Sequence, residues 1–135
     1  MQWQPLGKHR YSVDGALILV ETHGSLDPSE TQLLMLAMSK LQDTQGQVLA
    51  LFDVSGGASL PADSRRLIAT WDRRAGRPAP TAIVGAGLAL RTVATMVVQA
   101  IQLVSRKPSP LSFFQTQAEA RAWLAEQGPP QAPPS

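Results

Sequence analysis

Apolar runs of strand length alternate with helical patterns along most of the chain. Runs of this kind are typical of strands buried in a sheet, and they predict strands over residues 16–20, 48–52, 81–84 and 111–114. The segment before the first run, residues 1–15, predicts an irregular or edge strand in which His9, Tyr11 and Val13 alternate with polar residues. Asp14 and Gly15 then predict a two-residue hairpin turn.

Four amphipathic patterns lie between and after these runs. The first predicts a helix with a capping box, in which Asp27 caps the end, Pro28 takes the first position and Glu30 reaches back to the cap. Gly46 predicts its left-handed end. Its predicted sheet-facing residues are Leu33, Leu34, Leu36, Ala37, Met38 and Leu41. The other helices are predicted to begin near Pro61, Leu88 and Thr116, and glycines at 76 and 128 predict the ends of the second and fourth.

The predicted helix over residues 88–104 is apolar around most of its circumference. Its polar residues form one narrow stripe: Arg91, Thr92, Thr95, Gln99 and Gln102. It is shorter and more interrupted than a membrane span of about 20 apolar residues. The excess apolar surface must therefore contact the core, a partner or a lipid.

The order of predicted elements is β-β-α-β-α-β-α-β-α. Strands alternating with helices after an opening hairpin predict an α/β fold with a mixed, mostly parallel sheet and helices packed against it. A chain of 135 residues with 44% hydrophobic content is long enough for one domain, which we place at residues 1–127. The proline-rich residues 128–135 are expected to form a disordered tail.

Composition and missing motifs exclude several functional classes. The chain has no cysteine, which excludes disulfides, thiolate zinc sites and thiol catalysis. Together with an amino-terminal segment that lacks a signal-peptide pattern, this predicts a cytoplasmic protein. No catalytic triad or metal-ligand spacing occurs, so we expect no enzymatic activity, no metal and no cofactor. Basic residues are not interleaved with aromatics, so we expect no nucleic-acid binding.

Charge is unevenly distributed, although the formal net charge is only +2. Between Pro61 and Lys107 only Asp63 and Asp72 are acidic, against eight basic residues: Arg65, Arg66, Arg73, Arg74, Arg77, Arg91, Arg106 and Lys107. This asymmetry is typical of a surface for an anionic partner. Arginines that only complement helix C-terminal dipoles are the alternative interpretation.

The candidate site lies where two predicted strands end. The turn from Asp53 to Gly57 follows one strand, and the turn from Gly85 to Gly87 follows the next. Parallel strands bring such turns to one edge of a sheet, where helix N-termini favour anions. The predicted partner-binding or anion-binding edge comprises Asp53, Ser55, Gly56, Gly57, Asp63, Ser64, Arg65, Arg66, Gly85, Gly87 and Arg91.

Two serines of this edge are candidate phosphorylation sites. A phosphate on Ser64, in the first turn of the predicted helix, would face free N–H groups beside Arg65 and Arg66. An ordinary first-turn serine is the alternative. Ser55 is the second candidate, and the alternative there is local hydrogen bonding that shapes the turn.

From about Tyr11 to Gln127 the chain resembles a STAS domain, the module shared by sulphate transporters and anti-sigma factor antagonists. It most resembles the bacterial group similar to stage II sporulation protein AA. The resemblance rests on the element order and on five segments: 51–56 (LFDVSG), 82–85 (AIVG), 90–92 (LRT), 113–114 (FF) and 119–124 (EARAWL). It implies a non-enzymatic fold that binds a protein partner and is phosphorylated on a serine at the start of the second helix. Asp63 and Ser64 match that family's Asp-Ser-Ser-Gly segment, and arginines occupy the next two positions.

We therefore expect a regulatory interaction module resembling an anti-sigma factor antagonist, whose edge binds a kinase or an anti-sigma-like regulator. The alternative is a carrier or sensor of a lipid or another small apolar anion, because the sporulation-type relatives resemble Sec14-class lipid-transfer domains in outline. In that case the apolar helix 88–104 would line a pocket or touch a membrane, with arginines holding a headgroup. A homodimer through the same helix is a third use of its surface.

Overall fold

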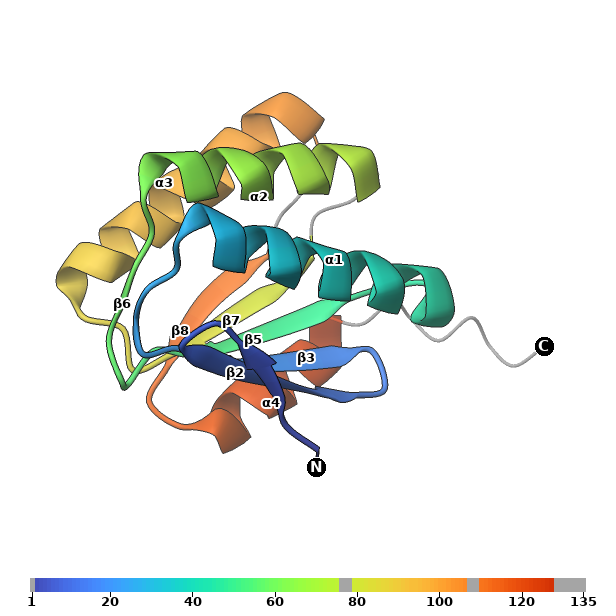
Figure 1. Ribbon diagram of the computed structural model, residues 1–135, viewed down its shortest axis with the longest axis horizontal. Helices are drawn as coiled ribbons and strands as arrows, with labels where there is room; N and C mark the ends of the chain where they lie inside the picture. Colours follow the sequence, from blue (N-terminus) through green and yellow to red (C-terminus); the bar gives the residue numbers. More distant parts are fainter. Residues whose placement is uncertain (1, 76–78, 107–109, 128–135) are drawn as a thin grey trace.

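A computed structural model describes residues 2–75, 79–106 and 110–127 (Figure 1). Within these residues, one six-stranded sheet has the order β1-β2-β3-β5-β7-β8. Its strands are β1 (Gln4–Leu6), β2 (His9–Asp14), β3 (Leu17–Glu21), β5 (Leu49–Asp53), β7 (Thr81–Val84) and β8 (Leu111–Phe114). The pairs β1–β2 and β2–β3 are antiparallel, and the pairs from β3 to β8 are parallel. The predicted α/β fold class is confirmed, and the arrangement is consistent with a STAS-like fold.

Helices cover both faces of the sheet (Figure 1). They are α1 (Pro28–Gln45), α2 (Ala62–Ala75), α3 (Leu88–Ser105) and α4 (Gln117–Gln127). Three of them, α1 to α3, lie on one face, and α4 lies on the other, packed on β5, β7 and β8. The second helix, α2, packs mainly against α1 and α3. The sheet is therefore a buried middle layer, as its apolar runs predict.

Side chains alternate between two cores along each central strand. In β5, Ala50 and Phe52 pack in the core beneath α1, whereas Leu49 and Leu51 pack in the core against α4. This period of two is the ordinary alternation of a strand, and it makes the two cores separate. The core against α4 includes the tilted ring pair Phe114 and Trp123.

Three short strands were not predicted. The opening segment, predicted as one irregular strand, is a hairpin in which β1 pairs with β2 across a turn at residues 7–8. Two further strands, β4 (Gly24–Ser25) and β6 (Ala58–Ser59), form a separate parallel ladder. Strands of two or three residues are too short to show a period, so the sequence pattern cannot identify them.

The predicted boundaries of α1 are confirmed. Asp27 accepts a hydrogen bond from the Glu30 N–H at 2.8 Å, and the Glu30 carboxylate accepts one from the Asp27 N–H at 3.0 Å. The helix ends at Gly46, which has a left-handed conformation with φ of 78°. The predicted apolar face is wrong in part, because Leu33 and Leu36 are 51% and 67% exposed. A helix lying on a sheet buries only the stripe nearest the strands, here through Leu34, Met38 and Leu41.

The Glu30 carboxylate also joins the opening hairpin to α1. It accepts hydrogen bonds from the Lys8 N–H at 3.1 Å and from the Lys8 ammonium at 2.9 Å. The buried His9 ring lies beside it, with Nε2 3.1 Å from both Glu30 Oε1 and the Ser25 carbonyl. Because the His23 N–H donates to His9 Nδ1 at 2.8 Å, the proton of the neutral ring is on Nε2. One carboxylate thus links β2, the loop after β3 and the first turn of α1.

Several predictions fall on residues outside the described ranges. These are the helix end at Gly76, the basic residues Arg77 and Lys107, and the tail 128–135. They stay predictions.

We expect Glu30→Gln to destabilise the fold by roughly 3 kcal/mol at pH 7. Burial alone raises the pKa of Glu30, but hydrogen bonds from Asp27 and Lys8 outweigh it and lower the pKa to about 2. A carboxyl whose pKa falls on folding stabilises the folded state above its unfolded pKa, near 4.5, and loses that contribution as the pH falls toward 2.

Urea unfolding between pH 2 and pH 7 measures this effect. The wild-type free energy of unfolding should fall through that window, and the Glu30→Gln profile should be flatter. The exposed Asp43→Asn is the control and should follow the wild type. Equal pH profiles for Glu30→Gln and the wild type would contradict the assignment.

Candidate functional site

The structure brings the turns after β5 and β7 together, as predicted. The Val54 N–H donates to the Val84 carbonyl at 2.9 Å, so the parallel ladder continues into the two turns. Gly85 has φ of +81°, and a Cβ at this position would lie 2.5 Å from Ser55 Oγ. Only glycine fits both the left-handed backbone and this close approach. The exposed Ser55 and Gly85 are therefore neighbours at one edge of the sheet.

Asp53 shapes the first turn. Its carboxylate accepts hydrogen bonds from the Ser55 N–H at 3.0 Å and from the Gln117 amide of α4 at 2.7 Å. Burial raises the pKa of Asp53, but the hydrogen bonds from Gln117 and Ser55 outweigh it, so that the pKa is lowered. For Ser55, the sequence analysis gave local hydrogen bonding as the alternative to phosphorylation. The hydrogen bond from the Ser55 N–H to Asp53 is of this local kind. Gln117 was not predicted, because its partner lies 64 positions away in the sequence.

The same turn is fastened to the end of β3. A Cβ on Gly56 would lie 2.6 Å from the Thr22 carbonyl, so no larger residue fits without a shift. The Thr22 hydroxyl donates to the Gly57 carbonyl at 2.9 Å, and the Thr22 N–H donates to the Asp53 carbonyl at 3.0 Å. The loop is therefore held by hydrogen bonds and by close packing.

Gly87 and Arg91 lie at the start of α3. Gly87 is the N-cap residue and makes no side-chain capping bond. The exposed Arg91 guanidinium lies 5.1 Å from the centre of the Phe113 ring, and its Nε donates to the Ala86 carbonyl at 3.2 Å. These contacts hold the guanidinium beside the Gly85–Gly87 turn, as an anion-binding edge requires.

The sequence analysis placed the start of α2 on this edge, and the structure differs from that prediction at Ser64. Ser64 has no exposed surface, and its hydroxyl donates to the Leu26 carbonyl at 2.8 Å. The exposed Asp63 pairs with the exposed Arg66 at 3.5 Å, and Arg65 is half-buried. The prediction that Ser64 presents a phosphate at this edge is therefore wrong. A phosphate on this oxygen would displace the Leu26 contact and bury charge.

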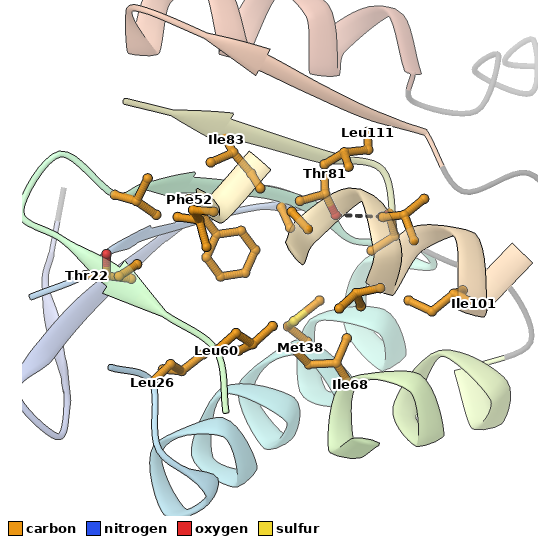
Figure 2. A pocket seen from close by; sticks show the side chains of 18 of the residues that line it. Thr22, Leu26, Met38, Phe52, Leu60, Ile68, Thr81, Ile83, Ile101 and Leu111 are labelled. Atoms are coloured by element: carbon orange, nitrogen blue, oxygen red, sulfur yellow. Dashed lines mark hydrogen bonds between the residues drawn. The ribbon is translucent and has the colours of Figure 1, made fainter. Parts of the chain in front are cut away.

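An apolar cavity of about 130 Å³ lies between the sheet and helices α1, α2 and α3 (Figure 2). Figure 2 shows Phe52, Thr81, Ile83 and Leu111 on the sheet side, facing Met38 and Ile68 across the cavity. The cavity residues on α3 are Leu90, Ala94, Val97, Val98 and Ile101. Leu26 and Leu60, beside the β4–β6 ladder, line one end, and Trp71 and Ala79 also contribute.

Three of the four hydroxyl or indole side chains that line the cavity, all except Ser59, donate hydrogen bonds within the protein. Thr22 donates to Gly57, Thr81 donates to the Ala79 carbonyl at 3.0 Å, and the Trp71 indole donates to Ser39 Oγ at 2.6 Å. Their polar atoms are therefore committed within the protein. The cavity presents mainly carbon to an occupant.

Helix α3 covers the cavity loosely. Among its described side chains that face the sheet only Ile101 is buried, and Leu90, Ala94, Val97 and Val98 are half-buried. The apolar residues around most of its circumference were the sequence signal for this feature, although periodicity cannot distinguish a filled core from a cavity. Of the helices in the described ranges, none has the length and apolar content needed to cross a membrane.

Comparisons with known proteins bear on the fold. No protein-family model matches the chain, and no curated protein sequence matches it. The chain is similar to a solved structure described as the NMR structure of the protein TM1081, with a TM-score of 0.57 and 12% sequence identity. The match covers 85% of this chain and 86% of that one. At this identity the likeness concerns the fold alone.

We expect Ser64→Asp to lower the free energy of unfolding by roughly 3 kcal/mol or more, because it places an unpaired charge in the interior. Ser64→Ala should cost about 1–2 kcal/mol, since the Leu26 carbonyl loses its donor. The exposed first-turn serine of α1 provides the control, and Ser29→Asp should change the free energy by less than about 0.5 kcal/mol. Chemical denaturation measures all three, and a Ser64→Asp protein as stable as Ser29→Asp would contradict the burial.

Proposed function

We propose that this chain is a cytoplasmic, non-enzymatic protein that binds a small apolar ligand in the cavity between its sheet and helices α1 to α3. The observation that carries the proposal is the apolar lining of that cavity beneath the half-buried side chains of α3. A well-packed core leaves few voids larger than a water molecule. A cavity of about 130 Å³ is therefore a candidate binding site.

Size and lining define the class of ligand. A cavity of roughly 150 Å³ lined by Leu, Ile and Phe stays dry and binds benzene. The cavity here has a similar volume and a similar lining, so we expect one aromatic ring or a short alkyl chain to fit. A ligand with an anionic group could place it beside Arg91, because Leu90 lines the cavity and Arg91 follows it on the exposed side of α3.

We expect benzene to bind saturably to the wild type, and Ala94→Leu to weaken this binding at least roughly tenfold. The larger side chain fills the cavity, and the same filling should raise the free energy of unfolding by about 1 kcal/mol. Ala100→Leu is the matched control, since Ala100 is exposed on the same helix. Titration calorimetry measures the affinity, and tryptophan fluorescence in a Trp3→Phe, Trp123→Phe background reports on Trp71, which lines the cavity.

Two results would contradict the proposal. One is the absence of saturable binding of benzene and of short alkyl chains to the wild type. The other is an Ala94→Leu protein that binds as the wild type does. If Ala94→Leu proves unstable, Val97→Phe offers a second way to fill the same space.

We propose a second role, favoured by the exposure of Ser55 and its contact with the turn after β7. In this role the edge formed by residues 53–57 and 85–91 binds a regulatory protein, such as a kinase or an anti-sigma-like regulator, and Ser55 is phosphorylated. A phosphate brings about two negative charges beside the Asp53 carboxylate, which is ionised at neutral pH because its pKa is lowered. The repulsion would open the Asp53 turn.

For this role, protein purified from its own host should carry phosphate on the Ser55 peptide and none on the Ser64 peptide, as mass spectrometry can determine. The variant Ser55→Glu should shift amide NMR signals of residues 53–57, 85–91 and 117. Ser29→Glu should leave those signals unchanged. Unmodified Ser55 in the host, or equal spectra for the two variants, would contradict the second role.

A further inference from the structure

The side of α3 that faces away from the cavity carries exposed apolar residues next to the exposed polar residues Thr92, Thr95 and Gln99. We define the outer face of α3 as Leu88, Ala89, Met96, Ala100 and Leu103, all of which are exposed. Among them, Leu88 is 82% exposed, Met96 is 55% exposed and Leu103 is 81% exposed. At about 100° per residue they lie roughly opposite the cavity-lining positions of the same helix. A soluble surface rarely exposes so many large apolar side chains on one helix.

The charged residues of α3 and of its C-cap have one sign. The sequence contains no Asp or Glu between Asp72 and Glu119, a stretch that includes the whole of α3. Arg91 near the start of α3 and Arg106 at its end are both exposed. Basic residues beside an exposed apolar helical face are typical of helices that lie in the surface of an anionic membrane.

We infer that the outer face of α3 docks on an anionic lipid bilayer, with its leucines and methionine among the acyl chains and Arg91 and Arg106 at the headgroups. A second copy of the chain suits this face less well, because it would bring the same uncompensated arginines and no carboxylate from its own α3. The inference rests on the proposed function in one respect, because it takes the bilayer as the source of the apolar ligand that the cavity binds. Helix α3 then separates the bilayer from the cavity.

Vesicle flotation tests the docking. The wild type should bind vesicles of phosphatidylcholine containing about one third phosphatidylserine, bind pure phosphatidylcholine weakly, and dissociate as salt is raised. The triple variant Leu88→Gln, Met96→Gln, Leu103→Gln should lose binding roughly tenfold or more. These side chains are exposed, so the fold should persist. The double variant Leu33→Gln, Leu36→Gln removes exposed leucines of α1 and should bind as the wild type does.

A second pair of variants tests the charges. Arg91→Gln with Arg106→Gln should lower binding to the anionic vesicles roughly tenfold and flatten its dependence on salt. Lys40→Gln with Arg66→Gln changes the net charge equally at exposed positions of α1 and α2 and should have a much smaller effect.

Three other outcomes would overturn the inference, and a fourth would overturn the proposed function alone. Equal binding by the wild type and the triple variant would remove the role of the outer face. A wild-type dimer that the triple variant abolishes, with no vesicle binding, would show that a second copy covers the face. If vesicle binding fails while Ala94→Leu still weakens benzene binding, the docking is wrong and the proposed function stands. If benzene binding fails and vesicle binding holds, only the proposed function is lost.

Discussion

A sheet with apolar side chains on both faces must be covered on both, and in this protein the two sides are covered unequally. On one face, α4 packs directly on β5, β7 and β8 through residues such as Leu124. On the other face α1 fills its share of the sheet, whereas α2 packs mainly against its neighbouring helices. The third helix contacts β8 with side chains that stay half-buried. The cavity follows from this arrangement, because the surface to be covered is wider than α1 and α3 can fill.

The turns at the strand ends hold one wall of the cavity. Thr22 lines the cavity, and its backbone and hydroxyl bind the turn that follows β5. The Asp53 carboxylate fixes that turn. Gln117 of α4, on the other face of the sheet, donates a hydrogen bond to this carboxylate. A chain of hydrogen bonds thus runs from α4 to the cavity wall. Thr22 therefore lies in contact with both the exposed edge of the sheet and the cavity.

Features with a local cause could be predicted from the sequence, and features with a distant cause could not. The capping box of Asp27 and Glu30 was predicted because all its partners lie within one helical turn. The bounds of β7 and β8 were predicted because prolines precede each apolar run, and a glycine turn or a helix-capping sequence follows it. The burial of Ser64 was missed because its partner, Leu26, lies 38 positions earlier, and a serine in a first helical turn carries no sign of its direction. The sequence offered a pocket lined by helix 88–104 only as an alternative, because a cavity is a property of packing between the sheet and three helices.

The composition of α3 is explained only when its two faces are considered together. A helix that covers a sheet needs one apolar stripe, and the stripe from Leu90 to Ile101 would satisfy the core. Leu88, Met96 and Leu103 lie on the other side and gain nothing from folding, since they stay mostly exposed to water. Burial within the chain therefore accounts for the inner apolar stripe of this helix and not for these three residues. The inferred bilayer would supply an apolar environment for these exposed side chains, and the absence of carboxylates along the helix favours one that is negatively charged.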